Sequence, residues 1–182
     1  MAPHTRGPFF GVWGCLFSFL LFIATFAFNM GTMHRELLLG DQKIVFDREG
    51  TLILYRDQIK AGEADHCDCA GCKNFVAQRG NAYPQHFLLL LNELGADPDK
   101  EWEAFDYDFE TSPGYRLYGG WFLFSGEIVE GATVRPGTKP FSYWFTTSFP
   151  NATFRSDAKL CAVEFCAEIY WNPPKSWPPS KH

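Results

Sequence analysis

Three cysteines, Cys67, Cys69 and Cys72, fall within one six-residue stretch of the chain. Cys69 and Cys72 are separated by two residues, so both thiols lie on one turn if a helix begins there. A soft divalent ion such as Zn²⁺ takes about four thiolate or imidazole ligands in a tetrahedron, and a Cys-x2-Cys pair supplies two of them. A helix N-terminus also favours the thiolate, the form of cysteine that binds metals. The spacing therefore predicts a zinc site.

A fourth ligand has to come from another part of the chain. Cys166 is the first choice, because alternation along the last predicted strand puts it on a polar, solvent-exposed face beside Glu164 and Glu168. The alternatives are His66, His86 and Cys161. The predicted metal ligands are therefore Cys67, Cys69, Cys72 and Cys166.

Two other states of the cysteines stay open: reduced thiols without a metal, and disulfides. The chain has 6 cysteines, and five remain when Cys15 in the apolar first segment is set aside. An odd number argues against a complete disulfide framework. The sequence also lacks a second Cys-x2-Cys pair, which would complete a tetrahedral site by itself.

No catalytic fingerprint accompanies the cysteines. The sequence lacks His-Glu-x-x-His, Gly-x-Ser-x-Gly, phosphate-loop and dinucleotide-binding patterns. The preferred function is a small binding or structural domain in which zinc fixes a helix start to a sheet. The alternatives are a metal-dependent enzyme with an open coordination position at the same cysteines, and a membrane-anchored exported domain.

Hydrophobic spacing predicts the elements that position the cysteines. A helix over residues 69–79 begins at the cysteines. A second helix over residues 87–94 has apolar residues at i, i+3, i+4 and i+7, with Pro84 before it and Gly95 at its C-cap position. Upstream, residues 44–46 and 52–55 are short β-prone runs that predict a hairpin.

From Glu101 onward apolar residues recur at every second position, which indicates strands. Gly and Pro clusters such as Ser112-Pro113-Gly114 and Arg135-Pro136-Gly137 supply the turns. In the last strand Cys161 shares an apolar face with Val163 and Phe165. The predicted fold is α+β: an antiparallel sheet of about five to six strands with the two helices packed on one face.

The 182 residues divide into three predicted parts. Residues 1–33 form a hydrophobic leader, residues 34–172 a single α+β domain, and residues 173–182 a Pro-rich flexible tail. Residues 7–33 carry no charged side chain, and such a stretch is long enough to span a bilayer. The leader is interpreted as an extension upstream of the true start, Met30 or Met33, as a signal peptide, or as a membrane anchor.

The first interpretation of the leader predicts a cytoplasmic protein. The other two predict a secreted or membrane-anchored one, through residues 8–30. The chain has 16 Lys+Arg and 21 Asp+Glu, a net charge of −5, and no basic run. Nucleic acid is therefore excluded as an expected partner, and a membrane is a partner only if the leader is retained.

Three motifs lie between about residues 63 and 126: Cys67-x-Cys69-x2-Cys72-x-Asn74-Phe75, then Leu94-Gly95 before Asp97-Pro98-x-Lys100-Glu101, then Tyr118-Gly119-Gly120-Trp121-Phe122. In these motifs the chain resembles an uncharacterised family of small, soluble bacterial proteins. The resemblance implies a soluble body that starts near Met33, and the leader departs from the family's pattern. No activity is established for the family, so the resemblance implies no catalytic residues.

Overall fold

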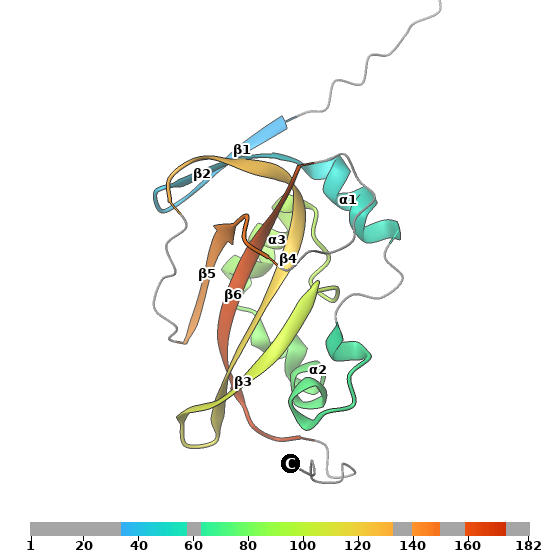
Figure 1. Ribbon diagram of the computed structural model, residues 1–182, viewed down its shortest axis with the longest axis vertical. Coiled ribbons are helices and arrows are strands. Elements are labelled where there is room, and N and C mark those ends of the chain that lie inside the picture. The colour runs from blue at the N-terminus through green and yellow to red at the C-terminus, as the bar shows by residue number, and fades with distance from the viewer. Residues whose placement is uncertain (1–33, 58–62, 133–139, 150–158, 174–182) are drawn as a thin grey trace, which may run out of the picture. The chain divides into compact units, whose positions relative to one another are not determined.

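The computed structural model describes residues 34–57, 63–132, 140–149 and 159–173 (Figure 1). The predicted leader, the predicted turn at residues 135–137 and most of the predicted tail lie outside these residues. Within them, no helix is long and apolar enough to cross a membrane.

A six-stranded antiparallel sheet occupies the centre of the described chain, which confirms the α+β prediction. Its strand order is β1-β2-β4-β6-β5, and β3 also pairs with β4. The 16-residue strand β4 is long enough to pair with both β3 and β2 along one edge, while β6 takes its other edge. The strands are β1 (His34–Leu39), β2 (Gln42–Asp47), β3 (Glu103–Ser112), β4 (Tyr115–Glu130), β5 (Phe141–Thr146) and β6 (Leu160–Tyr170).

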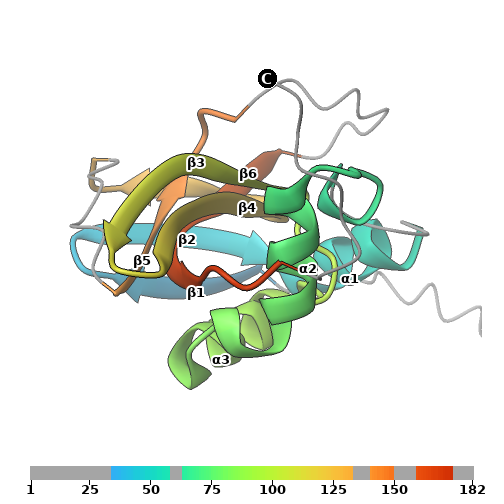
Figure 2. The ribbon, with the colours of Figure 1, turned by 90° about the horizontal axis from the view of Figure 1, so that it is seen from below.

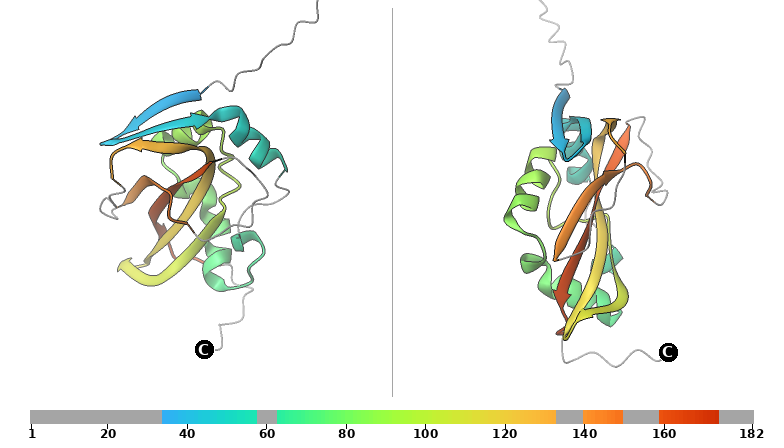
Figure 3. Two further views of the ribbon diagram at one scale, coloured as in Figure 1. Left: turned by 45° about the horizontal axis from the view of Figure 1, so that its top comes forward. Right: turned by 90° about the vertical axis from the view of Figure 1, so that its left-hand side faces the viewer.

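Helices α2 (Ala70–Ala82) and α3 (Gln85–Leu94) pack on one face of this sheet, as Figures 2 and 3 show. Phe75 of α2 stacks on Phe165 of β6, with ring centroids 6.4 Å apart, and Phe87 of α3 contacts Phe122 of β4. Gly95 ends α3 with φ 84°, the left-handed conformation of a glycine C-cap. Both predicted helices are therefore confirmed, and α2 continues beyond residue 79 to Ala82.

The hairpin predicted around residues 47–50 is wrong, because residues 48–57 form helix α1 (Arg48–Asp57). The Asp47 carboxylate caps this helix by accepting a hydrogen bond of 3.0 Å from the N–H of Gly50. Four consecutive apolar residues follow, and such a short run fits a strand or a helix equally well. The hairpin in this region is formed instead by β1 and β2, which turn at Gly40 with φ 61°.

The second face of β6 is buried at Glu164 and Cys166, so its predicted solvent exposure is wrong at these two residues, whereas Tyr170 at the end of the strand is exposed. Glu164 is 7% exposed and Cys166 is 5% exposed. Aromatic rings of β3 cover this face where β4 has no side chain: a Cβ atom on Gly119 would lie 2.8 Å from the Tyr107 ring and 3.0 Å from the Phe105 ring. The alternation itself is confirmed, since Cys161 belongs to the main core with Val163 and Phe165.

Candidate metal centre

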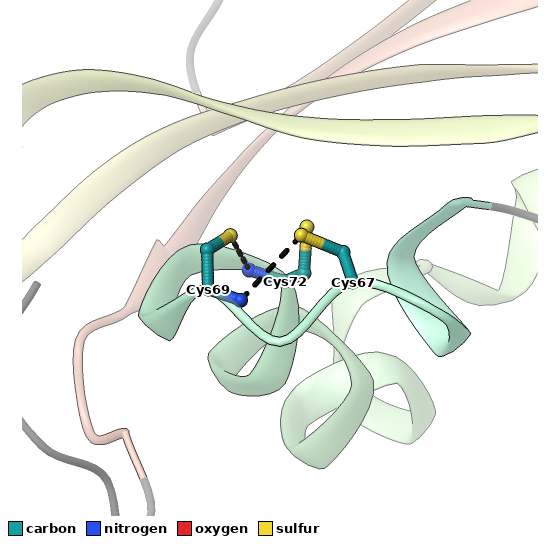
Figure 4. A group of neighbouring side chains, drawn as sticks. All are labelled: Cys67, Cys69 and Cys72. Carbon is teal, nitrogen blue, oxygen red and sulfur yellow. Dashed lines mark hydrogen bonds between the residues drawn. The ribbon is translucent and has the colours of Figure 1, made fainter.

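Cys67, Cys69 and Cys72 lie together where the chain enters α2 (Figure 4). Cys69 is the N-cap residue of α2, with an extended backbone (φ −70°, ψ 157°), and Cys72 lies in the first turn. The three Sγ atoms all lie within 4.8 Å of one another. Zn–S bonds of about 2.3 Å in a tetrahedron place sulfurs about 3.8 Å apart. The three thiols are therefore close enough to bind one metal ion.

Backbone N–H groups donate to two of the three sulfurs. The N–H of Cys72 donates to Cys69 Sγ at 3.3 Å, and the N–H of Cys69 donates to Cys67 Sγ at 3.5 Å (Figure 4). Hydrogen bonds to a charged acceptor stabilise its charged form. The local backbone therefore favours thiolates at the position where a metal needs them.

The thiols differ in how readily they lose a proton. Burial acts to raise the pKa of Cys69, but hydrogen bonds from the backbone of Cys72 and Gly71 and from the other two thiols outweigh it, and the pKa is lowered. The pKa of Cys72 is raised, first by burial and then by the sulfurs of Cys69 and Cys67. Negative charge on Cys69 and Cys67 repels a thiolate at Cys72. A bound divalent cation offsets this repulsion, because it stabilises every thiolate that coordinates it.

The group lies at the protein surface. Cys69 is exposed, whereas Cys67 and Cys72 are half-buried, and Cys72 packs against the main core. Cys67 also lines a surface pocket of about 330 Å³, together with Asp68 and Lys73. Asp68 and Lys73 form an ion pair at 3.0 Å. A ligand from solvent can therefore approach the sulfurs.

An ion-pair network connects the segment before the cysteines to α2 and to the residues just before β3. The Arg79 guanidinium pairs with Asp65 at 2.7 Å and with Glu101. Asp65 ends the short helix η1 (Glu63–Asp65), two residues before Cys67, and the Glu101 side chain is 0% exposed. The sequence analysis missed this network because its members are 14 and 22 residues apart, beyond any local spacing rule.

The first turns of α2 are docked on the sheet by a buried amide. Asn74 is 0% exposed, and its Nδ2 donates to Tyr118 Oη and to the Tyr170 carbonyl, both at 3.1 Å. Its Oδ1 accepts from the N–H of Asn172 at 2.8 Å. The Tyr118 hydroxyl in turn donates to the Gly71 carbonyl at 3.2 Å. The turn that carries Cys72 is therefore fixed to β4 and to the end of β6.

The structure brings together three of the four predicted ligands. Cys166 lies opposite Gly119 of β4 and Ser142 of β5. Its neighbour Phe165 contacts α2, so alternation turns Cys166 to the other face of the sheet. Among the described residues, Cys67, Cys69 and Cys72 alone form a group of metal-ligating side chains. Cys166 as the fourth ligand stays a prediction.

The alternative fourth ligands are in different surroundings. His66 is exposed in the segment next to Cys67. His86 on α3 lies against the ring of Tyr143, with centroids 5.7 Å apart. The Cys161 thiol is 1% exposed and lies 3.3 Å from the Gly126 carbonyl oxygen.

The fold and the site define a small α+β protein with a three-thiol group that can hold a metal ion. No family model, curated protein or solved structure matches this chain.

Proposed function

We propose that this protein is a small binding or structural domain that holds one zinc ion with Cys67, Cys69 and Cys72. The observation that carries the proposal is the packing of three sulfurs within 4.8 Å. Two of them accept backbone N–H groups. Thiolate-rich sites favour Zn²⁺ among the common divalent ions, since Mg²⁺ and Ca²⁺ prefer oxygen ligands. Bound zinc joins the segment at residue 67 to the first turn of α2.

The fourth coordination position separates the structural role from the enzymatic alternative. A structural zinc site is closed by four protein ligands, whereas a catalytic site keeps a water in the fourth position. The pocket beside Cys67 favours an open position, because it admits solvent on that side. A metal-dependent enzyme is therefore the second candidate function.

Native mass spectrometry of the reduced full chain, supplied with Zn²⁺, tests the proposal. We expect one zinc per chain, lost on addition of a strong chelator. Cys69→Ser is expected to abolish binding. Cys161→Ser is the matched control, because Cys161 is 1% exposed, its thiol contacts the Gly126 carbonyl, and it is not part of the three-thiol group. A wild-type chain that stays folded and metal-free at a zinc excess would refute the proposal.

Cys166→Ser then decides between the two candidate functions. Loss of the zinc would place Cys166 in a closed structural site, as the sequence predicts. Retention of one zinc per chain would leave the fourth position to water or to an external ligand, which is the coordination that an enzyme requires.

A further inference from the structure

The three thiols are also close enough to one another for disulfide chemistry. A disulfide needs two sulfurs about 2.05 Å apart and Cα atoms about 4.4 to 6.8 Å apart. All three Sγ atoms lie within 4.8 Å of one another, so a pair has to close by less than about 3 Å to reach bonding distance. Cys69 is an N-cap residue with extended φ and ψ, so turning its side chain breaks one capping hydrogen bond, from the N–H of Cys72, and leaves the hydrogen bonds between backbone groups of α2 in place.

Accessibility separates these thiols from the other described cysteines. Cys69 is exposed, and Cys67 and Cys72 are half-buried beside it. Cys161 is 1% exposed and Cys166 is 5% exposed. A small oxidant in solution therefore reaches Cys69 and is excluded from the two thiols on β6.

We propose that Cys69 undergoes thiol–disulfide exchange with a low-molecular-weight disulfide, closes a disulfide with Cys67 or Cys72, and thereby releases the metal. The release of metal rests on the proposed zinc site, whereas the exchange chemistry does not. The group then acts as a metal site whose occupancy depends on the thiol–disulfide balance of its surroundings.

The exchange takes two steps. In the first, Cys69 Sγ attacks one sulfur of the small disulfide, so that a mixed disulfide forms, the S–S bond of the oxidant breaks and one thiolate leaves. In the second, the sulfur of Cys67 or Cys72 attacks Cys69 Sγ, the mixed disulfide breaks and the second thiolate leaves. Two cysteines are oxidised by two electrons in total, the small disulfide is reduced to two thiols, and those thiols take up the two protons.

Oxidation removes two of the three sulfur ligands at once. A sulfur in a disulfide is no longer a thiolate, the form that binds metals. The remaining cysteine offers one ligand, too few to hold zinc against water.

The experiment uses the zinc-loaded full chain and oxidised glutathione. We follow free zinc with a chromophoric chelator, intact mass, and the position of the new bond by peptide mapping. We expect one disulfide that includes Cys69 within residues 67–72, the loss of two free thiols, and one zinc released for each disulfide formed. Dithiothreitol is expected to restore both thiols and zinc binding.

Two variants are treated in the same way, in the metal-free state. Cys161→Ser is expected to form the disulfide like the wild type. Cys69→Ser removes the attacking thiol and is expected to give no disulfide within residues 67–72. A stable mixed disulfide that never closes, a bond between Cys67 and Cys72 alone, or oxidation confined to other cysteines would each overturn the proposal.

The two proposals fail in different ways. A chain that binds no zinc but closes the disulfide refutes the metal site and leaves the exchange chemistry in place. A chain that binds one zinc and gives no disulfide after prolonged exposure to oxidised glutathione, with or without the metal, refutes the exchange and leaves the metal site in place.

Discussion

Replacing Arg79 by Met tests whether the ion-pair network fixes the segment that carries Cys67. Met keeps an unbranched apolar stem beside Phe75, whose ring centroid lies 5.7 Å from the guanidinium carbon. It leaves the Glu101 carboxylate, 0% exposed, without its cation. Removing one partner of a buried ion pair costs about 3 to 5 kcal/mol. The Asp65 side chain is 23% exposed, so its ion pair with Arg79 contributes less to stability, about 1 kcal/mol or below.

The loss of stability is expected to depend on pH. The pKa of Glu101 is raised above the ordinary value of a glutamate side chain, first by burial, and Arg79 opposes that rise. Without Arg79 the pKa rises further. A carboxyl group with a raised folded-state pKa stabilises the fold below its unfolded pKa, and this contribution is lost as pH rises through the folded pKa. Arg79→Met is therefore most destabilising near neutral pH and less so toward pH 4.5.

Urea denaturation of the wild type, Arg79→Met and Arg79→Met/Glu101→Gln at pH 7 and pH 5 measures these effects. With an m-value of about 2 kcal/mol/M, a loss of 3 to 5 kcal/mol lowers the midpoint by roughly 1.5 to 2.5 M. The double variant has no buried charge, so we expect it to recover part of the loss, leaving about 1 to 3 kcal/mol for an unpaired amide. A single variant within 1 kcal/mol of wild type, or a loss independent of pH, would refute the reasoning.

Three further predictions concern α2 and the thiols at its start. Asn74→Ala removes the amide that hydrogen-bonds to Tyr118, Tyr170 and Asn172. It is expected to lower the free energy of unfolding, measured by urea denaturation, by about 1 to 3 kcal/mol. The control is Asn92→Ala at an exposed site, and an equal or larger loss in that control would contradict the prediction. Gly71→Ala places a Cβ atom 2.9 Å from Asp106 Cβ, whereas a Cβ on Gly80 of the same helix meets nothing within 4 Å, so Gly71→Ala is expected to destabilise by about 1 to 3 kcal/mol and Gly80→Ala to be neutral or stabilising. Zinc affinity, measured by competition with a chelator, is expected to fall from pH 8 to pH 6, because protons compete with zinc for the thiolates. An affinity independent of pH would argue against thiolate ligands.

The helices beside the site could be predicted because their signals are local. Gly95 and the i, i+3, i+4 spacing define α3, and a Cys-x2-Cys pair at a helix start defines one turn whatever the rest of the chain does. Helix α1 could not be predicted in this way. Its residues 52–55 are apolar without a clear period, and the packing of Tyr55 (3% exposed) depends on tertiary contacts.

The position of the β6 cysteines relative to the three thiols depends on which face of the sheet α2 packs against. Alternation correctly separated Cys161 from Cys166, but it carries no information on which face a helix covers. The contact between Phe75 and Phe165 settles that question. The burial of Cys166 has a similar origin, since Phe105 and Tyr107 lie over Gly119, its partner on β4. Such cross-strand contacts require the register of β3 on β4.

None of the three thiols belongs to the buried residues of the main core, although Cys72 packs against it, and this determines the expected effect of metal removal. Its largest buried side chains include Phe46, Phe87, Phe122 and Phe165, on β2, α3, β4 and β6. Small zinc domains unfold without metal because they lack such a core. Here a zinc concentration one hundred times its Kd adds about 2.7 kcal/mol to the free energy of unfolding. Chelation is therefore expected to lower the Tm by several degrees and to leave the far-ultraviolet circular dichroism at 25 °C unchanged. Unfolding at 25 °C on chelation would mean that the metal, and not the aromatic core, holds the sheet and α2 together.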